Sequence, residues 1–245
     1  MPSGDYRTSH VGEEKSRRYE EDIYREGSYD EMLWRMEREL LIKEIRALQK
    51  EVGKVHYLDF ACGTGRIISA LEQFVEESYG IDVSSAMLER ARKKVKKSEL
   101  MYADLTTNDV LKDKTFDLIT AFRFFLNAEA ELGAIALSLL QKKLKDEKSI
   151  FIFNMHGNIM SHRLFTKFWY AVRGKHLNTA SLWEARRLAR SHGLEIIRWY
   201  GIGILPKVFY RYLNAQFLAA LDRLFFSLPL FKYVSYDLIF VCRKI

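Results

Sequence analysis

One short segment constrains the fold of this chain more than any other. An apolar, β-prone run, Val55–Ala61, leads into a turn that holds Gly63 and Gly65, and a helical pattern then covers residues 65–77. Glycine lets a chain turn tightly and lets a ligand come close to the backbone. A strand, a glycine turn and a helix in this order are typical of an α/β sheet that binds its ligand outside the carboxyl end of the strand.

The rest of the sequence repeats this alternation of strand and helix. Strands are expected over Ser78–Val83, Leu100–Ala103, Phe116–Phe122, Ser149–Asn154, Leu194–Tyr200 and Ser235–Cys242, and helices over residues 84–97, 129–145 and 181–193. Before the first strand, a capping-box pattern at Ser28–Glu31 begins a helix whose apolar stripe runs to about Lys50. Strands separated by helices predict a mostly parallel sheet with helices on both faces.

Length and cysteine content limit the class of protein. The 245 residues suit one α/β domain with an appendage. Cys62 and Cys242 are too few for a disulfide framework and favour reduced thiols in a cytoplasmic protein. The charged residues near Met1 are not expected to belong to a secretory signal, and no stretch approaches the roughly 18 uninterrupted apolar residues of a transmembrane helix.

The charge beside the glycine turn distinguishes two nucleotide-type ligands. A dinucleotide-binding turn needs a third small residue where Ile68 stands, and the carboxylate of Asp59 would repel a pyrophosphate. S-adenosylmethionine carries an ammonium and a sulfonium but no phosphate, so it suits this carboxylate better. Asp82 ends the second strand, where an acid can accept hydrogen bonds from two ribose hydroxyls. Asp104 ends the third strand, where it can hold the adenine amine.

Taken in order, these segments resemble the class I S-adenosylmethionine-dependent methyltransferase family. The resemblance rests on Asp59–Gly65, Gly80–Asp82, Ala103–Leu105 and Phe116–Ile119, and it covers roughly residues 50–155 with a last strand near 235–243. It implies a Rossmann-like sheet of seven mostly parallel strands, the last one antiparallel. It also implies S-adenosyl-L-methionine as the cofactor, bound by Asp59, Ala61, Gly63, Gly65, Asp82, Val83, Met87, Asp104, Leu105 and Phe122, with Tyr24 at the cofactor mouth.

Under this interpretation the chain has three parts. Residues 1–50 form an N-terminal helical cap, and residues 51–156 form the S-adenosylmethionine-binding core. Residues 157–245 complete the sheet and carry two extra segments, 157–180 and 201–234. Extra length between core elements is where substrate specificity is usually built.

The acceptor is expected at the ends of the fourth and fifth strands, where two candidate catalytic residues stand. Arg123 could clamp a phosphate or carboxylate of the acceptor, or pair with Glu129. The imidazole of His156 is expected to titrate near neutrality, and three roles stay open for it: a general base, a hydrogen-bonding partner of the substrate, or an incidental histidine at the strand end. His162 and His176 lack metal-ligand spacing with His156, so no metal site is expected.

The positive charge of the chain is concentrated in its last third. The net charge is +7, and residues 157–245 hold 14 Lys and Arg against 4 Asp and Glu. A basic excess of this kind indicates anionic partners. Segment 201–234 combines bases with aromatic residues, and three roles stay open for it: a wall of a large acceptor pocket, contact with an anionic membrane surface, or a homodimer interface.

We therefore predict a methyltransferase that O-methylates a small molecule, a sugar or a lipid-linked glycan carrying negative charge. The segments Arg123–Glu129 and His156–Asn158 are loosely similar to methyltransferases of surface-glycan or lipid biosynthesis. The alternatives are an RNA or protein methyltransferase and a non-catalytic, methyltransferase-like interaction protein. Ala121–Asn127 lacks the Asn/Asp-Pro-Pro-aromatic motif of DNA adenine methyltransferases, so base methylation of nucleic acid by that mechanism is not expected. The sequence also contains no separate RNA-binding module, which disfavours a nucleic-acid partner. The expected location is the cytoplasm, either free or at the inner face of a membrane.

Overall fold

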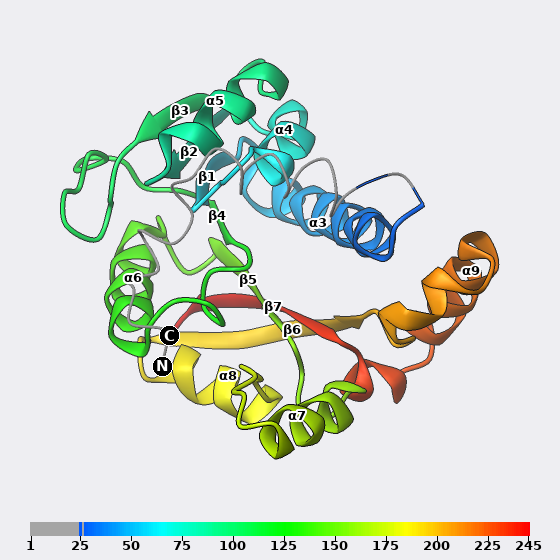
Figure 1. The fold of residues 1–245 in the computed structure, drawn as a ribbon. Helices are drawn as coiled ribbons and strands as arrows, with labels where there is room; N and C mark the ends of the chain where they lie inside the picture. The colour runs from blue at the N-terminus through cyan, green and yellow to red at the C-terminus, as the bar shows by residue number, and fades with distance from the viewer. Residues whose placement is uncertain (1–24, 26) are drawn as a thin grey trace.

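Seven strands form a single sheet in the order β3-β2-β1-β4-β5-β7-β6 (Figure 1). The strands are β1 (His56–Phe60), β2 (Glu77–Asp82), β3 (Glu99–Tyr102), β4 (Leu118–Ala121), β5 (Ile150–His156), β6 (Leu194–Ile202) and β7 (Asp237–Lys244). β7 runs antiparallel to β5 and β6, and the other neighbouring pairs are parallel. The predicted seven-stranded, Rossmann-like sheet with an antiparallel last strand is confirmed.

The computed structural model describes residue 25 and residues 27–245, so the prediction for Tyr24 lies outside the described residues. The described helices are α3 (Tyr29–Val52), α4 (Arg66–Leu71), α5 (Ser85–Lys94), α6 (Ala130–Lys143), α7 (Arg163–Val172), α8 (Leu182–Arg190) and α9 (Ala215–Phe226), with short 3-10 helices η2 (Glu72–Phe74), η3 (Lys207–Arg211) and η4 (Phe231–Val234). None of these helices is long and apolar enough to cross a bilayer.

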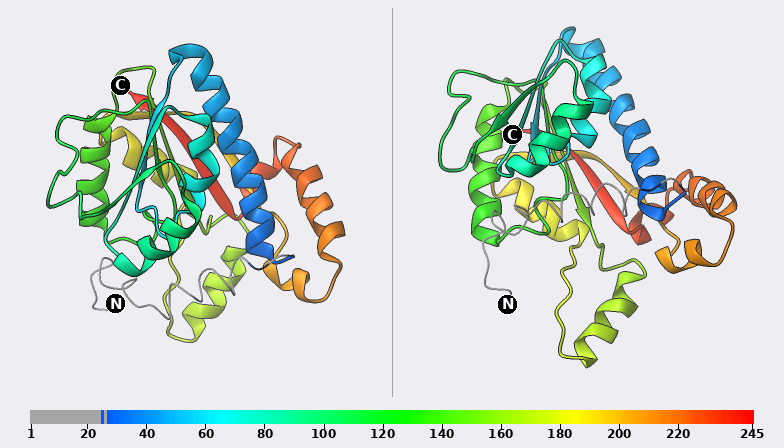
Figure 2. Two further views of the ribbon diagram at one scale, coloured as in Figure 1. Left: turned by 90° about the horizontal axis from the view of Figure 1, so that it is seen from above. Right: turned by 45° about the horizontal axis from the view of Figure 1, so that its top comes forward.

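Helices cover both faces of the sheet, and the strands send side chains to each face in alternation. On β5, Ile150 and Ile152 belong to the core under α3 and α4, whereas Phe151 and Phe153 belong to the core under α6 and α8. The two views in Figure 2 show α3 along one side of the sheet and α6 on the other. A continuous apolar run therefore forms a central strand that is buried on both faces, as parallel sheets require.

Local hydrogen bonds set the helix boundaries. Ser28 caps α3 by accepting the backbone N–H of Glu31 at 3.1 Å, as the capping pattern predicts. Residues 207–228 have a helix-compatible apolar pattern, but they do not form one continuous helix. Asn214 there accepts the backbone N–H of Phe217 at 3.0 Å and starts α9 as a separate helix after η3. Asparagine prefers this capping role to a place inside a helix.

Candidate functional site

A cavity lies at the carboxyl ends of β1 to β5, where the strand order reverses between β1 and β4. Open α/β sheets bind their ligands at such a switch point. Of the residues predicted from the sequence, the lining contains Asp59, Ala61, Gly63, Asp82, Val83, Met87, Asp104, Leu105, Phe122, Arg123 and His156. Gly65 lies outside this lining. The fold therefore brings the three strand-end acids and both candidate catalytic residues to one cavity.

Two non-glycine residues beside the cavity adopt a left-handed backbone conformation. Ala61 and Arg123, with φ of 55° and 59°, are the non-glycine residues with left-handed φ in the described part of the chain. This conformation costs free energy and persists only where the surroundings impose it. At Arg123, the backbone N–H donates to the Asn154 side chain at 2.6 Å, and Asn154 in turn donates to both carboxyl oxygens of Asp237. Both bends lie at the ends of strands that face the cavity.

The two glycines of the turn after β1 have different surroundings. Gly63 lines the cavity and donates its backbone N–H to Asp82 Oδ2 at 2.7 Å. Gly65 has a φ of 72°, and a Cβ at this position would lie 2.9 Å from the Cβ of Ala91. Glycine at position 65 therefore allows α4 to begin in close contact with α5.

Asp59 places a buried carboxyl at the cavity. Its Oδ1 accepts a hydrogen bond from the Thr120 hydroxyl at 2.7 Å, while Oδ2 makes no hydrogen bond of ordinary geometry to any described residue. Burial raises the pKa of Asp59 to about 7. The Thr120 hydroxyl, the backbone N–H of Ile68 and the charge of Arg66 lower that pKa in turn without cancelling the effect of burial. A buried acceptor without a partner is costly, so Oδ2 is suited to a cationic ligand group.

Asp82 is held in place by the backbone on either side of it. Its Oδ2 accepts the N–H of Gly63, and its Oδ1 accepts the N–H of Ser84 at 2.8 Å. Burial raises the pKa of Asp82, although the backbone N–H groups of Ser84, Gly63 and Val83 act in the opposite direction. An ionised carboxylate has about four lone-pair directions, so Asp82 can still accept a further hydrogen bond.

The third acid lies beside an apolar part of the lining. Asp104 Oδ1 accepts from both the backbone N–H and the hydroxyl of Thr106, at 2.9 and 2.5 Å, which fixes the loop after β3. Met87 and Leu105 also line the cavity, and both are buried. The cavity therefore offers a flat aromatic group both apolar contact and a neighbouring carboxyl.

His156 lines the same cavity at the end of β5, and its Nδ1 is buried without a hydrogen-bond partner among the described residues. Burial, together with the positive charges of Arg123 and Arg163, lowers the pKa of His156 to about 3. The prediction that His156 titrates near neutrality is therefore wrong. The imidazole is neutral throughout the physiological pH range, which is the form that can accept a proton.

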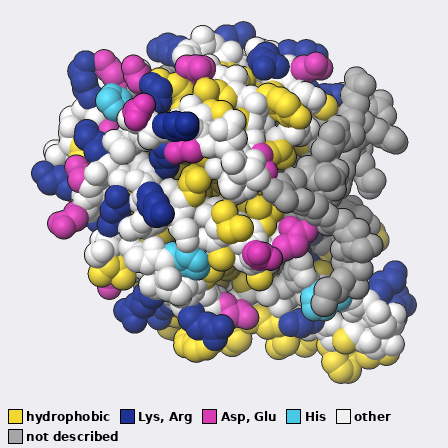
Figure 3. Space-filling view, turned by 90° about the vertical axis from the view of Figure 1, so that its left-hand side faces the viewer, with side chains coloured by type: hydrophobic (Ala, Val, Ile, Leu, Met, Phe, Trp, Pro, Cys, Tyr) yellow, Lys and Arg dark blue, Asp and Glu magenta, His cyan; other side chains and the backbone are white. Residues whose placement is uncertain are grey.

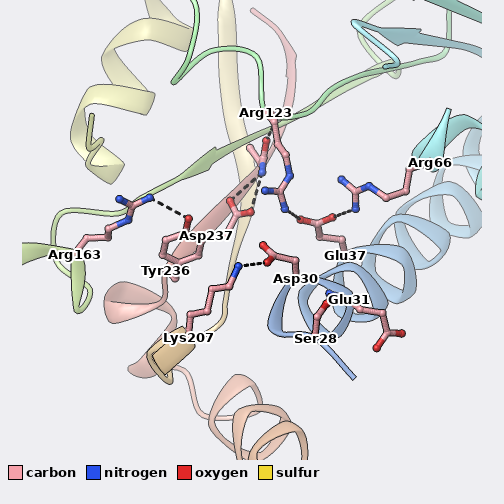
Figure 4. A network of polar contacts seen from close by, with 11 residues as sticks. Ser28, Asp30, Glu31, Glu37, Arg66, Arg123, Arg163, Lys207, Tyr236 and Asp237 are labelled. Carbon is pink, nitrogen blue, oxygen red and sulfur yellow. Dashed lines mark hydrogen bonds and ion pairs between the residues drawn. The ribbon is translucent and has the colours of Figure 1, made fainter. Parts of the chain in front are cut away.

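Glu37 of α3 joins the two cationic side chains of the site, and the sequence analysis did not single it out. Its fully buried carboxylate pairs with Arg66 at 2.8 Å and with Arg123 at 3.4 Å (Figure 4). Both arginines line the cavity, and Arg66 also stacks over the ring of Trp34 at 4.5 Å. The sequence contained one sign of this role: Glu37 is an acid that lies within the apolar stripe of the first predicted helix.

Segment 201–234 packs against α3 instead of closing the cavity. Lys207 pairs with Asp30 at 2.5 Å, as Figure 4 shows, and Arg223 pairs with Glu39 at 2.6 Å. No described residue of the segment belongs to the cavity lining. Of the three roles left open for this segment, the structure therefore gives no support to that of a pocket wall.

The core of the chain matches the model of a known protein family. Residues 58–148 match the model described as a methyltransferase domain. This match spans β1 to the end of α6, and it therefore contains the glycine turn and all three strand-end acids. No curated protein matches the chain.

Solved structures share the fold over nearly the whole chain. Magnesium protoporphyrin IX methyltransferase from Synechocystis PCC 6803, with bound SAH, has a TM-score of 0.67 at 14% identity and covers 98% of both chains. The N-methyltransferase NodS from Bradyrhizobium japonicum WM9, in complex with S-adenosyl-L-homocysteine, has a TM-score of 0.61 at 13% identity and covers 98% of this chain and 99% of that one. At these sequence identities, the similarity to the two structures shows a shared fold and nothing about the substrate.

Proposed function

We propose that this chain, an S-adenosylmethionine-dependent methyltransferase whose residues 58–148 match a methyltransferase domain, methylates a hydroxyl oxygen. One observation carries the proposal: the imidazole of His156, whose Nδ1 has no hydrogen-bond partner among the described residues, lies in the same cavity as the acids of three strand ends. The acceptor class we favour is a small molecule, a sugar or a lipid-linked glycan.

The chemistry of the lining fits S-adenosylmethionine, which supplies a methyl group activated on a sulfonium. The unpartnered Oδ2 of Asp59 suits an ammonium group, and Asp82 keeps acceptor capacity for the hydroxyls of a ribose. Asp104, Leu105 and Met87 suit an adenine. This donor set would have little use for a pyrophosphate, because a carboxylate repels it.

His156 is proposed to take the proton of the acceptor hydroxyl. Its low pKa keeps the imidazole unprotonated before the reaction, although it also makes the imidazolium costly while Arg123 and Arg163 stay charged. Methyl transfer removes the positive charge of the sulfonium as the proton reaches His156, so the net charge in the cavity does not rise. Charge balance of this kind lowers the cost of a buried cation.

Arg123 is proposed to position an anionic group of the acceptor. Arg123 and Arg163 both act on His156 electrostatically, so the potential around the imidazole is positive. Glu37 offsets part of the charge of Arg123 and holds its guanidinium in one place. An arginine held in this way can form two parallel hydrogen bonds to a phosphate or a carboxylate.

Asp82→Ala is expected to weaken S-adenosylmethionine binding by about 10- to 150-fold. The substitution removes hydrogen bonds to a charged group worth roughly 1.5–3 kcal/mol. Calorimetric titration measures the effect. An analogue without ribose hydroxyls serves as the control, because its affinity for the variant and for the unaltered chain should be nearly equal. If the variant loses affinity equally for S-adenosylmethionine and for this analogue, Asp82 does not bind the ribose hydroxyls.

Cofactor affinity is also expected to depend on pH through Asp59. The pKa of Asp59 is raised to about 7, and only the ionised carboxylate pairs with an ammonium, so affinity should fall by about tenfold for each pH unit below 7. The α-amino group of the cofactor has a pKa of about 8, so it stays protonated at pH values below 7. Titrations at several pH values test this, with Asp59→Asn expected to bind weakly with a flat profile. A flat profile for the unaltered chain would contradict the assignment.

The acceptor class is tested by radiolabelled methyl transfer into a fractionated cell extract. We expect label in a small-molecule, glycan or lipid fraction, bound through an ether linkage that resists mild base. Label found only in RNA or protein would overturn the proposed acceptor class and leave the methyltransferase assignment intact.

A further inference from the structure

α7 has its apolar face turned outward. Spaced along this helix, Leu164, Phe165, Phe168, Trp169 and Val172 form one wide stripe, and all five are exposed, Phe165 at 79% and Phe168 at 73%. No residue of α7 is buried. A surface helix of a globular protein normally buries its apolar stripe in the core, whereas α7 exposes its apolar stripe to solvent.

The polar side of α7 is the one that contacts the protein. Arg163 donates to the Tyr236 hydroxyl at 3.1 Å, as Figure 4 shows, and Lys167 donates to the Thr179 hydroxyl at 3.0 Å. Figure 2 shows α7 at the periphery of the molecule, beyond the end of the sheet. These hydrogen bonds hold the helix so that its aromatic side chains face away from the fold.

Exposed apolar residues continue from α7 onto the neighbouring segment. Asn158, just before α7, donates to the backbone oxygens of Tyr233 and Ser235, which ties the start of the α7 segment to η4. Leu230 and Tyr233 are both exposed. On the face drawn in Figure 3, hydrophobic side chains gather along the lower edge, the level at which α7 lies in Figure 1. Exposed apolar side chains that gather in this way mark an interaction site.

The charged residues of the α7 segment itself all have one sign. Residues 157–180 contain four Lys and Arg and no Asp or Glu. Arg173 and Lys175 follow α7 directly and are exposed, and the guanidinium of Arg173 stacks over the ring of Trp169 at 4.2 Å. Basic residues beside Trp and Phe on an amphipathic helix are typical of helices that lie in the interface of an anionic bilayer.

We propose that α7 and the adjoining η4 dock this protein onto an anionic lipid surface, with the aromatic side chains of α7 entering the headgroup region. A second copy of the chain fits this surface less well. A symmetric contact through α7 would bring the basic residues of two 157–180 segments together, with no acid in either segment to pair with them. Anionic headgroups supply that missing charge.

Flotation of the full chain with lipid vesicles, without cofactor or acceptor, tests this proposal separately from the proposed reaction. We expect binding to vesicles of phosphatidylcholine mixed with phosphatidylglycerol, much weaker binding to phosphatidylcholine alone, and loss of binding at high salt. Phe168→Ser should weaken binding by about tenfold or more, because a buried phenylalanine side chain is lost from the interface.

Two further variants make the experiment specific. Tyr102→Ser removes an aromatic ring of similar exposure, 66%, from the opposite edge of the sheet, and it should bind vesicles like the unaltered chain. Arg173→Glu combined with Lys175→Glu should abolish the preference for phosphatidylglycerol. Absence of vesicle binding, or binding that Phe168→Ser leaves unchanged, would overturn the proposal. A lipid-free dimer that Phe168→Ser dissociates would overturn it in favour of a second copy.

Discussion

His156→Ala is expected to lower kcat by about 10²- to 10⁴-fold and to leave the Kd for S-adenosylmethionine unchanged, because the variant loses a general base but no group that we assign to the cofactor. Since burial and two neighbouring arginines lower the pKa of His156 to about 3, the imidazole is already unprotonated at neutral pH. The kcat of the unaltered enzyme should therefore show no inflection from this residue near neutrality. Steady-state kinetics and a calorimetric titration measure the two quantities.

His162→Ala is the matched control for this prediction. His162 lies six residues after His156 in the sequence and is partly buried. Its ring stacks on that of Tyr236, with ring centroids 5.6 Å apart, and it does not line the cavity. Its removal should leave kcat within a few-fold of the original value. If His156→Ala keeps full kcat, His156 is not the base and the hydroxyl assignment loses its main support.

Glu37→Leu is expected to lower the free energy of unfolding by about 3–5 kcal/mol. Removing one partner of a buried ion pair is strongly destabilising, and here two guanidiniums, of Arg66 and Arg123, lose the same carboxylate. Their side chains are 13% and 15% exposed, so water replaces the lost partner poorly. Urea denaturation monitored by circular dichroism gives the change.

Glu39→Leu on the same helix separates this effect from a loss of helix propensity. Glu39 pairs with Arg223, but both side chains are more than half exposed, 63% and 56%, so the pair should contribute less than about 1 kcal/mol. Equal destabilisation by the two variants would show that the pairing with Arg66 and Arg123 contributes nothing beyond the helix itself.

The sequence was sufficient to predict the sheet and the position of the site, because both follow from local patterns. Apolar runs such as Ile150–Asn154 form strands, and the glycine turn marks the end of β1. The acids at 59, 82 and 104 meet because parallel strands place their carboxyl ends at one edge. Helix α7 was not predicted: its apolar spacing is readable, but the outward direction of its aromatic residues depends on Arg163 and Tyr236, which lie 73 residues apart.

The electrostatics of the site could not be read from the sequence. Glu37 lies 29 residues from Arg66 and 86 from Arg123, so their pairing depends on how α3 packs on the sheet. The pKa of His156 was misjudged for the same reason. Burial and the approach of Arg123 and Arg163 are consequences of tertiary structure, and no local pattern around His156 reports them.

Calorimetric titration of the full chain with S-adenosylmethionine, in competition with NAD, most directly tests whether the strand-end acids enclose a cationic nucleoside without phosphate. We predict that one molecule binds per chain, that NAD does not displace it, and that Asp82→Ala weakens the binding. An absence of binding at saturating concentration, or displacement by NAD, would contradict this account of the site.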